Sequence, residues 1–198
     1  MGARDGIVIE CKSMNHKRLL AVVALLLAPA LYASAQAAPD WKARVAETMP
    51  LLGHRNWILI VDSAYPLQTS PGIETIETNA NQLEVVRHVL RVIEGSIHVR
   101  PLVYMDAELP FVPEEDALGV SVYRTQIHDL LANYPVELIP HDKVIANVDE
   151  AGKTFHVLVL KTSLTIPYTS VFIRLDCKYW SADAEKRLRA KMGGSAVR

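Results

Sequence analysis

The stretch LLGHRNWILIVDSAYP, Leu51–Pro66, decides how the rest of the chain is interpreted. Its centre, WILIV, is an unbroken apolar run, which is typical of a buried strand in an α/β protein. Polar side chains stand at both ends of this strand, because His54 precedes it and Asp62 follows it directly. A buried strand requires neither residue for packing, so both are candidates for a functional role.

Further strands alternate with amphipathic helices along the chain, and Pro101 in one of them favours a sheet edge or a bulge. This alternation predicts an α/β fold with three layers, α/β/α, and a mostly parallel sheet. We expect one domain over 39–180 and a basic C-terminal helix with a tail over 181–198. The other strands are predicted over 72–78, 97–105, 136–140, 156–160 and 171–175, and the helices over 41–52, 82–95, 113–135 and 141–148.

The first 38 residues are interpreted as an upstream extension and a signal peptide. Lys17 and Arg18 precede the apolar run 19–31, and small residues follow it as in a cleavage site. A membrane-spanning helix needs roughly 20 apolar residues, and this run is shorter. We therefore expect an exported protein, periplasmic or secreted, without stable membrane insertion. Translation from Met14 instead of Met1 would place the start beside these charges.

The composition argues against several classes of function. A formal net charge of -1 offers no basic surface for nucleic acid. The histidines do not pair at metal-ligand spacing, so no metal site is predicted. Neither a G-x-S-x-G elbow nor a glycine-rich phosphate loop is present, which disfavours hydrolases and nucleotide-dependent enzymes. Cys177 lies in a strand pattern and is not expected to be a nucleophile, and the carboxylates of MDAELP and PEED are interpreted as solvated.

Polar side chains recur where predicted strands end. Asp62 follows the first strand, His141 follows VELIP, and the loop after HVLVL carries Tyr168 and Ser170. In α/β proteins, ligands bind at the carboxyl ends of parallel strands. The spacing is therefore consistent with one pocket that these residues share, and also with ordinary capping and turn roles.

Three segments, in order, resemble motifs of the ribose pyranase and fucose mutarotase family. LGH followed by a strand that ends in VDSAYP is similar to that family's L-G-H, apolar strand, D-A-x-x-P pattern. VELIPHDKV is similar to its short strand followed by a histidine, and KTSLTIPYTSVFI to its R-T-G-E-x-x-P-Y-x-N-I-I signature. The resemblance spans about 45–175. Ser170 replaces the asparagine, Ser163 and Leu164 replace the Gly-Glu pair, and Ile145 stands where members often have lysine.

The resemblance implies a small α/β/α subunit that assembles into a ring-like homo-oligomer, often a decamer, with sugar sites near subunit contacts. It also implies interconversion of cyclic forms of a free monosaccharide without a metal or organic cofactor. In this hypothesis His54 is the general acid/base, Asp62 orients a partner or a sugar hydroxyl, and His141 takes the complementary proton. Tyr168 and Ser170 would bind the sugar.

Acid/base ring opening suits these residue types, because histidine titrates near neutrality and a neighbouring carboxylate can orient it. The expected activity is therefore that of an exported sugar isomerase of the pyranase or mutarotase type. Two alternatives stay open: a non-catalytic carbohydrate-binding protein with the same cleft, and a structural oligomer that binds no sugar.

Overall fold

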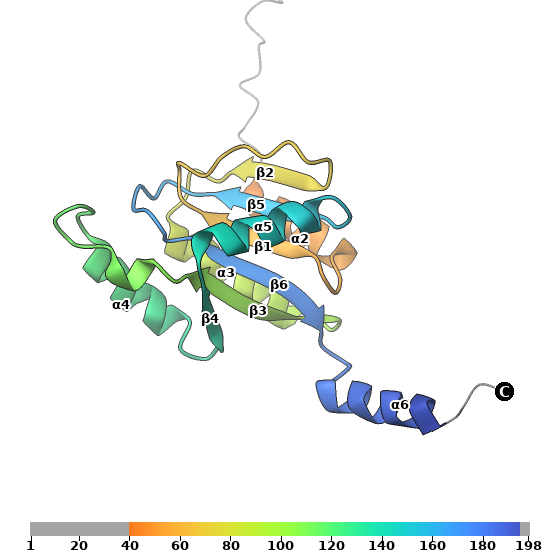
Figure 1. Cartoon of the computed structure of the whole chain (residues 1–198). Coiled ribbons are helices and arrows are strands. Elements are labelled where there is room, and N and C mark those ends of the chain that lie inside the picture. The colour runs from red at the N-terminus through yellow and green to blue at the C-terminus, as the bar shows by residue number, and fades with distance from the viewer. Residues whose placement is uncertain (1–39, 195–198) are drawn as a thin grey trace, which may run out of the picture. The chain divides into compact units, whose positions relative to one another are not determined.

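A computed structural model describes residues 40–194, and its centre is one six-stranded sheet (Figure 1). The predicted signal peptide, 1–38, and the last four residues of the tail lie outside the described residues. The strands follow the order β2-β5-β1-β6-β3-β4 across the sheet. Their bounds are β1 Trp57–Val61, β2 Ile73–Glu77, β3 Val99–Asp106, β4 Val136–Ile139, β5 Val157–Lys161 and β6 Val171–Cys177.

Five of the six strands run in the same direction, which confirms the mostly parallel sheet. Strand β5 is parallel to both β1 and β2, and β3 is parallel to β4. Only β6 is reversed, because it pairs antiparallel with β1 and β3. The sequence explains this reversal: 162–170, between β5 and β6, forms no helix, and a parallel return would require a long crossover connection.

Helices cover both faces of the sheet, so the predicted three layers are confirmed. Residues of α2, α3 and α4 pack in one core cluster with Ile58 and Ile60 of β1. Residues of α5 pack with Leu59 and Val61, which point to the opposite face because side chains alternate along a strand. The helices are α2 Trp41–Thr48, α3 Gln82–Gly95, α4 Val120–Leu130, α5 His141–Gly152 and α6 Ala182–Gly194, with 3-10 turns at Met49–Leu51 and Leu109–Phe111.

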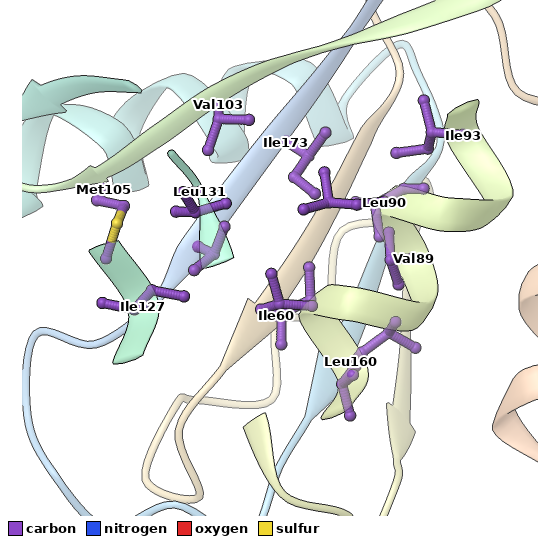
Figure 2. Close-up of a cluster of buried hydrophobic side chains, with 14 of the residues drawn as sticks. Ile60, Val89, Leu90, Ile93, Val103, Met105, Ile127, Leu131, Leu160 and Ile173 are labelled. Atoms are coloured by element: carbon purple, nitrogen blue, oxygen red, sulfur yellow. The ribbon is translucent and has the colours of Figure 1, made fainter. Parts of the chain in front are cut away.

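The larger core lies between the sheet and α3. Figure 2 shows Val89, Leu90 and Ile93 of α3 facing Ile60 and Ile173 of the sheet. All five side chains are at most 3 % exposed. The apolar stripe that predicted helix 82–95 therefore points to the sheet, and Asn81 caps the helix by accepting a hydrogen bond from the backbone N–H of Leu83.

Three predicted helices differ from the observed ones. The helix predicted over 41–52 is α-helical only to Thr48 and ends in the 3-10 turn Met49–Leu51, and the helix predicted to end at 135 ends at Leu130. The helix predicted over 113–135 begins only at Val120, because Gly119 has a φ of 90° and interrupts the helical backbone. Glu114 therefore lies outside the helix and caps it, accepting hydrogen bonds from the N–H groups of Gly119 and Ser121. Helix α5 continues to Gly152, beyond the expected end at 148.

Pro101 has the edge environment that its position in β3 predicted. It pairs with Leu175 of β6, whereas β4 begins to pair with β3 only at Val103. The other side of β3 is therefore open at Pro101, and the missing N–H removes no ladder hydrogen bond there.

Helix α6 follows β6 and contributes no residue to either core cluster. No helix within 40–194 has the length and apolar character needed to cross a membrane.

Candidate functional site

The carboxyl ends of β1 and β3 lie at the same edge of the sheet, because both strands are antiparallel to β6 between them. This edge carries Asp62 after β1, Asp106 at the end of β3 and His141 after β4. The loop 162–170 enters β6 from the same edge. The fold thus gathers at one edge most of the polar residues that the sequence selected.

A cleft of about 340 Å³ opens at this edge. It brings together Asp62, His141 and Tyr168, three of the five predicted site residues. Among the described residues that line it, there is neither lysine nor arginine. The lining residues are Asp62, Ala64, Tyr65, Pro66, His141, Thr165, Ile166, Pro167 and Tyr168.

His141 is held at both its backbone and its ring. It is the first residue of α5, and its backbone N–H donates to the Glu108 carboxylate, at 3.0 and 3.1 Å from the two oxygens. Its ring Nδ1 lies 2.9 Å from Asp106 Oδ1. The side chain remains 35 % exposed, whereas Asp106 is fully buried. One end of the imidazole is therefore anchored while the residue still reaches the cleft.

Burial raises the pKa of Asp106 above its ordinary value, and the hydrogen bond to His141 partly opposes this shift. The neighbouring carboxylates Glu108 and Asp62 raise it further. Tyr65 is also buried, and its burial, with carboxylates nearby, raises the pKa of its phenol. The hydroxyl of Tyr65 therefore stays protonated and donates to Gln68 Oε1 at 3.0 Å.

The Asp62 and Tyr168 side chains are presented by tight backbone turns. Asp62 Oδ1 accepts a hydrogen bond from the backbone N–H of Ala64 at 2.8 Å, which fixes the turn after β1. Tyr168 has a φ of 56°, in the left-handed region that non-glycine residues rarely adopt. Its ring meets the His141 ring edge to face, with centroids 5.5 Å apart.

A buried polar network fixes the loop that carries Tyr168. Gln82, at 1 % exposure, hydrogen-bonds through its amide nitrogen to the Tyr123 hydroxyl and the Thr169 carbonyl. Its amide oxygen accepts from the Thr162 hydroxyl, which also donates to the carbonyl of Val61 beside Asp62. Helices α3 and α4 are thereby joined to both loops of the cleft.

The structure does not bring His54 to this cleft. His54 precedes β1 and therefore lies at the opposite edge of the sheet, with its Nδ1 3.0 Å from Asp176 Oδ1. Arg100 donates to the other oxygen of Asp176 at 2.6 Å. The His54 side chain is 56 % exposed and lines clefts of about 570 and 610 Å³ at that edge.

Ser170 is next to the cleft in sequence but lies below its surface. It is 1 % exposed and is not among the residues that line the cleft. Tyr168, two residues earlier, is 40 % exposed and does line it. Of the two residues predicted to bind sugar, the structure therefore places only Tyr168 where a ligand in this cleft can touch it.

The sequence interpretation of MDAELP as solvated carboxylates is wrong for Asp106. Its side chain is buried and reaches His141, and Glu108 holds the backbone of the same histidine. The signal was present in the sequence, because Asp106 directly follows the predicted strand 97–105, as Asp62 follows the first strand. Within 40–194, no group of three or more histidine, cysteine, aspartate or glutamate side chains is arranged to hold a metal ion.

Comparisons with known proteins place the fold. No protein-family model matches the chain, and no curated protein matches it. Among solved structures, Bacillus subtilis RbsD complexed with D-ribose is similar, with a TM-score of 0.50 and 14 % identity over 68 % of this chain and 92 % of that chain. The protein therefore has an α/β fold of the RbsD type.

Two further structures are also similar. FucU from Bifidobacterium longum has a TM-score of 0.46 and 14 % identity, covering 68 % of this chain and 94 % of that chain. The fucose mutarotase from Streptococcus pneumoniae in complex with L-fucose has a TM-score of 0.46 and 13 % identity, covering 72 % and 97 %. The fold expected from the sequence resemblance is confirmed by the similarity to RbsD alone, whose TM-score is 0.50.

Proposed function

We propose that this protein is a sugar isomerase that interconverts the cyclic forms of a free monosaccharide by acid/base ring opening. The observation that carries the proposal is the convergence of Asp62, His141 and Tyr168 on one cleft at the carboxyl edge of the sheet. The similarity in fold to RbsD complexed with D-ribose supports the choice of a sugar as the ligand class of this cleft.

The three side chains supply the base and the sugar-binding groups that ring opening requires, and the acid comes from outside this cleft. A base must remove the proton of the anomeric hydroxyl, and an acid must protonate the ring oxygen. His141 is the base in the cleft, Asp62 accepts hydrogen bonds from sugar hydroxyls, and Tyr168 donates one and packs against the sugar. The imidazole can accept a proton from the substrate and return it in each turnover.

The charge of the cleft favours an uncharged sugar. Its lining includes Asp62 and, among the described residues, neither lysine nor arginine. Asp106 and Glu108 lie directly behind His141. Phosphate and carboxylate groups would be repelled by these carboxylates and would find no cation with which to pair. A free aldose fits this environment better than a sugar phosphate or a uronic acid.

His54 enters the mechanism through a second copy of the chain. Strand β1 alone separates His54 from Asp62 by roughly 16 Å, at about 3.3 Å per residue, which is further than one monosaccharide can bridge. In a ring-like homo-oligomer, head-to-tail contacts repeat around the ring, so one edge of a subunit can meet the opposite edge of its neighbour. The exposed His54 of one subunit then protonates the ring oxygen of a sugar bound at its neighbour's cleft.

Saturation-transfer NMR with ribose, fucose, galactose and glucose tests the activity, because it observes exchange between anomers and ring forms directly. We expect accelerated exchange that His141→Ala abolishes and that His128→Ala, an exposed histidine of α4, leaves unchanged. Binding without exchange would refute catalysis and favour the carbohydrate-binding alternative. If the protein neither binds these sugars nor accelerates their exchange, the proposal of a sugar site is refuted.

Mixed oligomers test the role of His54. The variants His54→Ala and His141→Ala should each be inactive, but co-expressed oligomers should regain about one quarter of the sites, because only one of the four neighbour pairings has both histidines. Absence of any recovery from oligomers that contain both variants would refute the shared site.

We also propose that the protein acts outside the cytoplasm. The basis is the basic and apolar segment within 1–38 with its small-residue cleavage motif. N-terminal sequencing of the protein purified from the periplasmic or secreted fraction should find a start near residue 38. An intact N-terminus in the cytoplasmic fraction would refute export.

A further inference from the structure

His141 has a buried acidic partner that the sequence motifs did not indicate. Asp106 is the last residue of β3, is fully buried, and lies with Oδ1 2.9 Å from His141 Nδ1. Its other oxygen has no hydrogen-bond partner among the described residues. The strand register fixes its position, because Asp106 pairs with Ile139 of β4, two residues before His141.

From this geometry we propose that Asp106 is a positioning residue that fixes the tautomer of His141 and so makes its Nε2 the base of the cleft. The inference rests on the proposed function for the identity of the proton that Nε2 removes. An ionised carboxylate has no hydrogen to donate, so the hydrogen bond requires a proton on Nδ1. Nε2 then keeps its lone pair and is free to accept a proton from a ligand.

If the Asp106–His141 hydrogen bond only fixed the start of α5, it would duplicate the contact that Glu108 already makes there. Pro140 precedes α5 and provides no side-chain cap, but Glu108 accepts the first backbone N–H of the helix with both oxygens. The start of α5 is therefore fixed without Asp106. Asp106 additionally fixes the orientation and tautomer of the His141 imidazole, which the Glu108 contact to the backbone does not do.

The proton balance of the step is closed within the proposed site. Nε2 of His141 takes the proton of the anomeric hydroxyl, and the O–H electron pair forms the carbonyl as the bond from the anomeric carbon to the ring oxygen breaks. The ring oxygen takes a proton from the acid, which we propose is His54 of the neighbouring copy. Ring closure on either face of the carbonyl reverses both transfers, so no external reactant is consumed.

Asp106 would also stabilise the transient imidazolium of His141, as buried aspartates do beside catalytic histidines. The titratable groups that act on Asp106 are His141, Glu108 and Asp62, which come from α5, the segment after β3 and the end of β1. Glu108 and Asp62 carry the same charge as Asp106, so His141 is the one group of these three that can become a cation. His141 is thus its natural counter-charge once protonated.

The test is the tautomer of His141 in the sugar-free protein, read from its ¹⁵N imidazole shifts. We expect a proton on Nδ1 in the wild-type protein and a shift of the proton to Nε2 in Asp106→Asn, whose amide can donate to Nδ1. The matched control is Asp142→Asn, the same change at the exposed residue after His141, which should leave the tautomer unchanged. A proton on Nε2 in the wild type, or no change in Asp106→Asn, would overturn the proposal.

Kinetics give the second readout. We expect Asp106→Asn to lower kcat for ring-form exchange about 10- to 100-fold, as loss of an orienting partner does, while KM changes little. Unchanged kcat would overturn the proposal while leaving the proposed function intact. If the wild type shows no exchange, the proposed function fails, and the tautomer measurement still decides whether Asp106 orients His141. If Asp106→Asn does not fold, the tautomer of His141 in the wild-type protein still tests the proposal.

Discussion

Replacement of Gln82 by methionine should loosen the loop that forms one wall of the cleft. Gln82 is almost fully buried, and its amide joins the Tyr123 hydroxyl, the Thr169 carbonyl and the Thr162 hydroxyl. Methionine has nearly the same length and no branch, so it fills the space but can make none of these three hydrogen bonds. The change therefore isolates the polar network from the packing.

The expected loss in the free energy of unfolding follows from the hydrogen bonds that Gln82→Met removes and from those that remain. Each intramolecular hydrogen bond contributes about 1 kcal/mol net, and the Thr162 hydroxyl shares its single hydrogen between Gln82 and Val61, so the lost bonds correspond to about 2–3 kcal/mol in the free energy of unfolding. No partner is left unpaired, because Tyr123 still donates to the Thr169 carbonyl and Thr162 still donates to the Val61 carbonyl. The further penalty for an orphaned buried group is thus not expected.

Urea unfolding of the wild type and of Gln82→Met measures this loss, as a lower midpoint with an unchanged m-value. The matched control is Gln126→Met, the same change at an exposed position of α4, which should change stability by less than about 0.5 kcal/mol. A loss below about 1 kcal/mol in Gln82→Met, or one equal to the control, would refute the argument that the network holds the loop.

Two further changes test the sheet edge and the packing beneath it. Burial raises the pKa of Asp106, so the contribution of this carboxyl to stability is complete below the ordinary pKa of about 4 and is lost as pH rises through the raised value. Asp106→Asn should therefore melt at a higher temperature than the wild type at pH 7, and this difference should shrink toward pH 4. Calorimetry that finds the opposite trend with pH would contradict the reasoning. Gly72→Ala should cost about 1–3 kcal/mol in urea unfolding, since the added Cβ would lie 2.5 Å from two backbone carbonyl oxygens, and a neutral effect would show that β2 shifts freely.

The fold was predictable because its signals are local. Alternating strands and helices predicted the three layers, and the helical stripe of 82–95 predicted which face is buried. The reversal of β6 follows from the helix-free connection before it. The late start of α4 was missed because acidic residues near a helix start fit both its first turn and an external cap, and Gly119 decides between them.

The site was predictable only in part, because it depends on which strand ends meet in space. The rule that selected Asp62 and His141 also applies to Asp106, but burial of an acidic residue cannot be inferred from a loop-like sequence such as MDAELP. For His54, a resemblance between motifs assigns a role but not the chain that performs it. The strand length separates His54 from Asp62, and that separation leads to the proposal of a shared site.

Backbone strain supports the assignment of function to both edges of the sheet. Among the described residues other than glycine, three have a positive φ: Arg55, Asn79 and Tyr168. Asparagine tolerates this conformation, but for arginine and tyrosine it costs about 1–3 kcal/mol. One of these two residues adjoins His54 and the other lines the cleft. Strain at both edges is expected if each edge contributes half of a site that is completed between two copies of the chain. If the two edges had only a structural role, residues that relieve the strain at Arg55 and Tyr168 would make the protein more stable.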